Sequence, residues 1–139
     1  MQYQKYADTY LLRLEPEEEI LAALGALAAA EGILLAEVGG LGALKELEVC
    51  VFDTVKKVYY TNTFAQPMEL ISLTGTITQM DGAPYLHLHA AAGDGAGRVL
   101  GGHLKRAVVS ATAELTVRTL PGRVDRRYSD AIGLNLLDF

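Results

Sequence analysis

Some residue types are scarce in this sequence, and each scarcity excludes a class of protein. Only one of its 139 residues is cysteine, Cys50. A single thiol cannot close an internal disulfide, which indicates a reducing compartment, so we expect a cytoplasmic protein with Cys50 packed as a small apolar residue. No apolar run is long enough to span a bilayer, and the polar residues 1–8 carry no secretory signal. A membrane is therefore not an expected partner.

Basic charge is scarce as well. Twelve Lys and Arg residues stand against 17 Asp and Glu residues, which gives a formal net charge of −5. Binding to a phosphate backbone needs clustered basic side chains. The clusters Lys105–Arg106 and Arg123–Arg127 are short, and we interpret both as solvated surface. Nucleic acid is therefore not an expected partner either.

Apolar residues, in contrast, are plentiful. Half of the sequence is hydrophobic, which is enough for a core without disulfides or a structural metal. The length fits one domain and no stretch resembles a linker, so we predict a single domain over residues 1–139 with its core from about residue 9. A bound metal is then expected to serve function rather than folding.

The pattern near the N-terminus predicts one amphipathic helix. Pro16 suits a first helical position, and the glutamates 17–19 that follow complement the positive end of a helix dipole. Apolar residues recur at helical spacing over Ile20–Leu27, and Gly32 is a natural stop. We interpret residues 17–19 as a solvated helix start rather than as a metal site.

In the rest of the chain, apolar residues alternate with a period of two, which predicts strands. Asp81–Gly82 predicts a tight turn between two of them, and Gly39–Gly40 with Gly42 predicts a flexible turn between two others. One helix among several hairpin-connected strands predicts the α+β class, with a mainly antiparallel, barrel-like sheet. The predicted strands are residues 9–14, 33–38, 44–52, 56–64, 68–79, 85–91, 107–120 and 134–137.

All three histidines of the chain lie in one short region. On a strand, His87 and His89 point to one face while Leu88 points to the other. His103 follows the glycine-rich residues 93–102, which would let the backbone turn and return His103 to that face. A His-x-His pair alone is often only a buried or cross-strand pair, but the third histidine favours a metal site. Three imidazoles on one zinc ion leave a fourth position for water or substrate.

Two carboxylates stand where a proton-transfer group is plausible. Glu69 opens the predicted strand 68–79, and Glu114 lies in the middle of strand 107–120. A carboxylate in the middle of a strand needs a partner if it is buried, and a metal-bound water, a histidine or Arg127 would serve. The alternative is that both carboxylates face solvent, and periodicity alone leaves the two interpretations open.

Several segments together form a recognisable series. They are the glutamate-led strand Glu69–Ile77, the histidine strand Asp81–His89, the Gly-Gly-His-Leu segment Gly101–Leu104, the Thr-x-Glu of Thr112–Glu114, and the tail Arg127–Leu134. In this order they resemble the plants and prokaryotes conserved domain, the PPC domain. The resemblance runs from about Thr9 to the C-terminus.

The resemblance implies a homotrimeric α+β domain in which His87, His89 and His103 match the histidines that hold zinc in some prokaryotic members. It also implies a fold similar to that of α-acetolactate decarboxylase, an analogy that assigns no activity. Plant members bind DNA through an accompanying Arg-Gly-Arg-Pro core. That core is absent here, and Gln66–Met68 stands where plant members have Gly-Arg-Phe.

We therefore predict a stand-alone, prokaryotic-type PPC protein that forms a homotrimer. It would bind a divalent metal, expected to be zinc, through the three histidines, and would act on or sense a small molecule. Glu69 and Glu114 are the predicted proton-transfer groups, and Arg127 is predicted to hold an anion. The alternative is a regulatory or DNA-associated trimeric module without catalytic activity, so enzyme status stays open.

Overall fold

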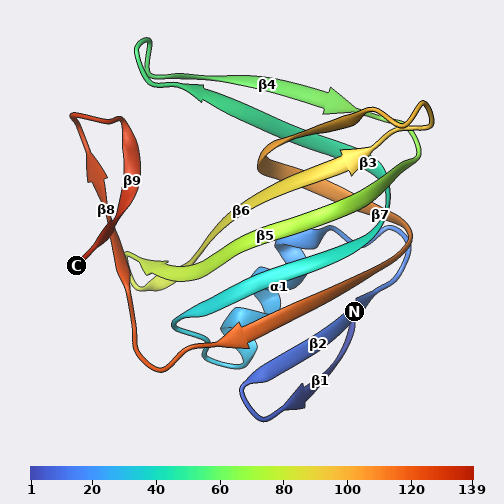
Figure 1. Ribbon diagram of the computed structural model, residues 1–139. Coiled ribbons are helices and arrows are strands. Elements are labelled where there is room, and N and C mark those ends of the chain that lie inside the picture. The colour runs from blue at the N-terminus through green and yellow to red at the C-terminus, as the bar shows by residue number, and fades with distance from the viewer.

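One β-sheet of nine strands makes up most of the protein, and a single helix packs against it (Figure 1). The computed structural model describes residues 1–139. In Figure 1 the C-terminal hairpin β8–β9 stands to one side of the sheet, apart from helix α1. The elements are β1 (Gln2–Tyr6), β2 (Thr9–Leu14), α1 (Ile20–Ala30), β3 (Ala36–Asp53), β4 (Val58–Phe64), β5 (Met68–Met80), β6 (Ala83–Gly93), β7 (Val99–Thr119), β8 (Asp125–Ser129) and β9 (Leu134–Asp138).

Four strands of the sheet pair in a closed circuit. β3 pairs with both β5 and β7, and β6 joins β5 to β7 on the other side. The other strands extend outward, with β2 and β1 beyond β7, β4 beside β3, and β8–β9 beyond β5. Every pairing is antiparallel except one parallel bridge between Gln79 and Asp125. The predicted α+β class with a mainly antiparallel sheet is confirmed, although the whole sheet is not a regular barrel.

Helix α1 begins later than its sequence pattern predicts. It starts at Ile20 rather than at Pro16, because the side chain of Glu19 caps it. The Glu19 carboxylate accepts hydrogen bonds from two backbone N–H groups of the first turn (3.1 and 2.8 Å) and from the N–H of Ala107 on β7 (3.0 Å). These contacts satisfy donors that a helix start leaves free, and they tie the helix to the sheet. The predicted stop is confirmed, since Gly32 adopts a left-handed φ of 62°.

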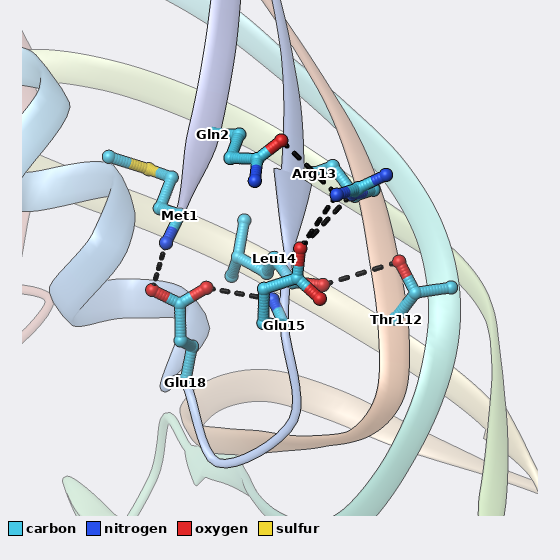
Figure 2. Close-up of polar contacts among 7 residues, drawn as sticks. All are labelled: Met1, Gln2, Arg13, Leu14, Glu15, Glu18 and Thr112. Carbon is cyan, nitrogen blue, oxygen red and sulfur yellow. Dashed lines mark hydrogen bonds and ion pairs between the residues drawn. The ribbon is translucent and has the colours of Figure 1, made fainter.

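A second glutamate of residues 17–19, Glu18, holds the N-terminus in place (Figure 2). Its carboxylate pairs with the amino group of Met1 and accepts a hydrogen bond from the backbone N–H of Glu15 at 2.7 Å. Arg13 in turn donates to the side chain of Glu15 at 2.8 Å. The interpretation of residues 17–19 as a plain solvated helix start is therefore wrong. All three glutamates join neighbouring segments of the fold, since Glu17 also pairs with Lys45 of β3.

Two strands, β1 and β8, have no counterpart among the predicted strands. The five residues of β1 are all exposed, and the sequence of β8 is Asp-Arg-Arg-Tyr-Ser. Neither segment shows the apolar alternation that marks a half-buried strand. Each is held mainly by the backbone hydrogen bonds of one neighbouring strand, β2 or β9. Periodicity cannot detect strands of this kind.

Strand β3 runs unbroken where the sequence predicted two strands and a glycine turn. Gly40 and Gly42 lie inside it, at irregularities in its pairing with β5 and β7. A Cβ at Gly40 would stand 2.8 Å from the carbonyl oxygen of Glu114, and a Cβ at Gly42 would stand 2.6 Å from that of Thr112. These glycines therefore allow two strands to approach closely and do not turn the chain.

The glycine-rich residues 93–102 also form a shorter turn than predicted. The loop spans only Asp94–Arg98, and Gly101 and Gly102 already lie in β7 and pair with β6. The predicted turn is present and returns His103 to the side of His89, but its glycines are Gly95 and Gly97. Gly101 and Gly102 belong instead to the ladder between β6 and β7 that aligns the histidine.

The core lies between the sheet and the helix. The helix buries the side chains of Ile20, Leu24 and Leu27, as the helical spacing predicts. Strand residues such as Leu44 and Ile77 meet them in one continuous apolar cluster. No helix of the structure is both long enough and apolar enough to cross a membrane.

A close contact between β5 and β6 bears directly on the histidine strand. Gly75 of β5 pairs with Leu88, while the residues on either side of it pair with His87 and His89. A Cβ at Gly75 would stand 2.0 Å from the carbonyl oxygen of His87 and 2.8 Å from Cα of Leu88. Only glycine lets the two strands lie this close.

We therefore expect Gly75→Ala to destabilise the protein. The added methyl group must push β6 away from β5, which would lower the free energy of unfolding by about 1–3 kcal/mol. Urea denaturation measures this, with Gly95→Ala as the control, because a Cβ at Gly95 meets nothing within 4 Å. Equal stability of the two variants would contradict the packing argument.

Candidate metal centre

The three histidines meet on two adjacent strands. His87 and His89 lie on β6, and His89 is the direct partner of His103 on β7. The ring centroids are 5.3–5.5 Å apart. One nitrogen of each ring lies within 4.8 Å of the other two. The structure thus brings together the three imidazoles that the sequence singles out.

This histidine cluster opens into a cavity of about 520 Å³. The cavity is walled by residues of β3, β4, β6, β7 and the C-terminal hairpin β8–β9, so central strands and the C-terminal hairpin enclose it together. Most of the wall is apolar or aromatic, and Arg126 and Asn135 are the main polar side chains besides the histidines. The apolar and aromatic wall includes Phe52, Tyr59, Tyr85, Leu134, Leu136 and Leu137.

The surroundings hold two of the imidazoles in the neutral form. Burial, together with the two neighbouring histidines, lowers the pKa of His103 from 6.5 to about 4. Burial also lowers the pKa of His87, and the positive charge of Arg126 adds to the effect. A neutral imidazole is the form that binds a metal ion. The cluster is therefore ready for a metal at neutral pH.

The set of donors fits zinc. The cluster offers three imidazole nitrogens and no carboxylate. Such a set suits zinc and similar transition ions, whereas calcium and magnesium require oxygen ligands. Nitrogens within 4.8 Å of one another need only small side-chain rotations to reach one ion. Three protein ligands would leave one tetrahedral position for water or a ligand.

Cys50 lies beside the cluster without joining it. It pairs with His103 across β3 and β7, and it is 1% exposed. Burial raises the pKa of its thiol, which disfavours the thiolate that reacts and binds metals. The interpretation of Cys50 as a packed residue is confirmed.

The two candidate carboxylates lie away from the cluster within one chain. Glu69 pairs with Gly93 and borders a separate cleft at the loop between β6 and β7. Glu114 faces a groove formed with β1 and β2, eleven residues along β7 from His103. Their predicted role in proton transfer would therefore require a second copy of the chain, and it stays a prediction.

The arginine that the structure places at the cavity is Arg126. Its Nη2 lies 3.4 Å from Nδ1 of His87. Arg127, which the sequence analysis chose, is exposed and pairs with Asp138 at 2.9 Å. Consecutive strand residues point to opposite faces, so one of two adjacent arginines had to face inward. Nothing in the polar segment 125–129 indicates which one.

Comparison with known proteins agrees with the resemblance in sequence. The family model of the Plants and Prokaryotes Conserved (PCC) domain, the domain called PPC above, matches residues 1–121. The chain belongs to this family. Among curated proteins, none matches the chain.

Solved structures of similar proteins cover almost the whole chain. A Bacteroides thetaiotaomicron protein, described only provisionally as DNA-binding, is 36% identical with a TM-score of 0.96 over 99% of this chain and 96% of that one. A metal-containing protein from Archaeoglobus fulgidus is 28% identical with a TM-score of 0.90, over 100% and 99% of the two chains. Acetolactate decarboxylase from Bacillus subtilis is 15% identical with a TM-score of 0.60, over 84% of this chain and 54% of that one. This last likeness concerns the fold alone.

We expect the metal-free protein to lose stability as the pH falls from 6.5 towards 4. His103 takes up a proton near pH 6.5 in the unfolded chain, but only at about pH 4 in the folded one. Between these values the unfolded state binds more protons, so the free energy of unfolding decreases as the pH falls. Above pH 6.5 both states are neutral at this residue, and the effect is absent.

Urea denaturation in the presence of a chelator, at several pH values between about 7 and 5, measures this loss. His103→Gln is the comparison, because glutamine takes up no proton in this range. The variant should lose less stability than the wild type over the same interval. Identical pH dependence in the two proteins would contradict the assignment.

Proposed function

We propose that this PPC protein is a homotrimer that binds zinc through His87, His89 and His103 and binds a small molecule at the metal. The observation that carries the proposal is the cluster of three imidazoles, within 4.8 Å of one another, beside a cavity of about 520 Å³. A relative with the same fold that is described as metal-containing supports it. The single buried thiol of Cys50 fits the cytoplasmic location that we also propose.

Zinc held by three imidazoles supplies a Lewis acid that polarises a carbonyl group or lowers the pKa of bound water. The chain's own residues would define what reaches it. The aromatic and aliphatic wall excludes water around a ligand, and Arg126 adds a positive charge next to His87. Glu69, Glu114 and Arg127 would contribute only if another copy of the chain brings them to the cavity.

DNA association is the second candidate, because two relatives are provisionally described as DNA-binding. The charges of this chain do not favour it. Seven of its 12 Lys and Arg residues pair with carboxylates, and the net charge is −5. A phosphate backbone attracts free, clustered basic side chains. We therefore do not propose nucleic acid as the ligand.

The exposed strand β4 supports assembly into a homotrimer. It pairs only with β3, and six of its seven residues are exposed, although Tyr59 also borders the cavity. The strand includes Val58, Tyr59 and Tyr60. A free strand edge with exposed apolar side chains is typical of a surface that another protein covers. We propose that other copies of the chain cover it.

We expect wild-type protein to bind about one zinc ion per chain. His89→Ala should weaken zinc binding by more than tenfold, since even the loss of a residue that merely supports a ligand costs about that much. His89 is exposed, so its replacement should not disturb the core. Metal analysis after dialysis against zinc, together with a competition titration, measures both quantities.

Thr74→Ala is the matched control for this experiment. Thr74 is exposed and pairs with His89 across β5 and β6, but it offers the cluster no ligand atom. Its zinc affinity should equal that of the wild type. A wild type that takes up no zinc, or a His89→Ala variant that binds it as tightly, would contradict the proposed site.

We expect light scattering to give the wild type a mass of about three times the 14.9 kDa of one chain. Tyr60→Glu should shift the protein to smaller species, because a charge would be buried in the proposed contact. Tyr6→Glu is the control, a similarly exposed tyrosine on another edge strand, β1. A monomeric wild type, or equal effects of the two substitutions, would contradict this assembly.

A further inference from the structure

Arg126 is held at the cavity by neutral groups only. Its Nε donates to Oγ1 of Thr78 at 2.9 Å, and its Nη1 donates to the carbonyl oxygen of Asn135 at 2.9 Å. Its guanidinium lies over the ring of Tyr85, with Cζ 4.9 Å from the ring centroid. Its Nη2 lies 3.4 Å from Nδ1 of His87. These contacts fix the guanidinium in one orientation without neutralising its charge.

This environment distinguishes Arg126 from every other arginine of the chain. The other six all pair with a carboxylate; they are Arg13, Arg98, Arg106, Arg118, Arg123 and Arg127. Arg126 is also partly buried, and burial lowers the pKa of its guanidinium. A partly buried charge without a counter-ion is costly, so such a residue is typical of an anion site.

The guanidinium still has donors to offer. It carries five N–H groups, and its contacts with Thr78, Asn135 and His87 use three of them. Two N–H groups, one on each terminal nitrogen, remain for a ligand. A planar guanidinium with two free donors matches the two oxygens of a carboxylate.

Zinc binding at the proposed site would release one more donor. If zinc takes Nε2 of His87, the neutral ring carries its proton on Nδ1, and if zinc takes Nδ1, the lone pair there is used. In either case Nδ1 can no longer accept a hydrogen bond from Nη2 of Arg126, 3.4 Å away. When zinc is bound, the guanidinium of Arg126 has one acceptor fewer, so an anion binds to it more favourably. Zinc binding and anion binding are therefore coupled.

The rest of the cavity selects the uncharged part of such a ligand. Beside Arg126 the wall is formed by side chains such as Phe52, Leu134, Leu136 and Leu137. Hydrocarbon placed against them leaves water at a gain of about 25 cal/mol per Å². A second charge on the ligand would find no basic partner in this wall. The cavity thus combines one anion-binding group with an apolar wall.

We propose that the cavity binds a small aliphatic monocarboxylate, whose carboxylate pairs with Arg126 when the three histidines hold zinc. This inference rests on the proposed zinc site and adds the class of ligand to it. Arg126 is the specificity-determining residue. Metal and carboxylate bind cooperatively, so each raises the affinity for the other.

The test uses 4-methylpentanoate as the probe and isothermal titration calorimetry of the zinc-loaded protein. 4-Methylpentanamide, which has the same shape and no charge, is the ligand control. The wild type should bind the carboxylate at least about tenfold more tightly than the amide, the effect expected of hydrogen bonds to a charged group. Removing zinc should weaken carboxylate binding. No measurable binding of the carboxylate, or equal binding of the amide, overturns the proposal.

Arg126→Gln and Arg127→Gln form the matched pair of variants. Arg126→Gln should lose most of the preference for the carboxylate, whereas Arg127→Gln should keep it, because Arg127 points away and already pairs with Asp138. Arg126→Lys keeps the charge and should keep part of the preference if Arg126→Gln fails to fold. Equal carboxylate affinity in the two glutamine variants overturns the proposal.

Zinc content is measured on every sample, because it separates a failure of the proposed zinc site from a failure of the proposed carboxylate ligand. A wild type that takes up no zinc contradicts the proposed function itself. Zinc bound normally by wild type and both glutamine variants, without any dependence of carboxylate binding on Arg126, contradicts only the inference about the ligand.

Discussion

The antiparallel ladder between β6 and β7 is the constraint on which the whole candidate site depends. It sets His89 directly opposite His103, and the alternation along β6 then puts His87 on the same face. A slip of one residue in this register would turn the histidines of β6 to the opposite side of the sheet. This register requires a glycine at position 101, since a Cβ at Gly101 would stand 2.4 Å from the carbonyl oxygen of Ala90. The glycines of this region thus serve strand contact, and through it the geometry of the metal ligands.

The chemistry of the site follows from where this ladder lies in the fold. It ends at a cavity whose remaining walls come from the β3–β4 hairpin and from the C-terminal hairpin. Partial burial there keeps His87 and His103 neutral, which favours metal binding. Arg126, which contacts His87, has no counter-ion at the cavity. A cation site of neutral donors beside an unpaired guanidinium is suited to a ligand that brings the negative charge itself.

The sequence predicted the features that periodicity and residue type determine. The α+β class, the buried face of α1 and the grouping of the three histidines follow from apolar spacing and strand alternation. The sequence could not reveal contacts that depend on tertiary pairing. Gly40 and Gly42 read locally as a turn, but their role depends on the backbone of β7 lying against them. The sequence could not predict the inward orientation of Arg126, because β8 is polar and only the cavity distinguishes its inner face from its outer one.

X-ray absorption at the zinc edge of the zinc-loaded wild type tests the central claim most directly. The account predicts imidazole scattering from three nitrogens at about 2.0–2.1 Å, plus one further light donor supplied by water or a ligand. A sulfur neighbour at about 2.3 Å would bring Cys50 into the site and contradict the assignment. A first shell of oxygens without imidazole scattering would contradict it equally.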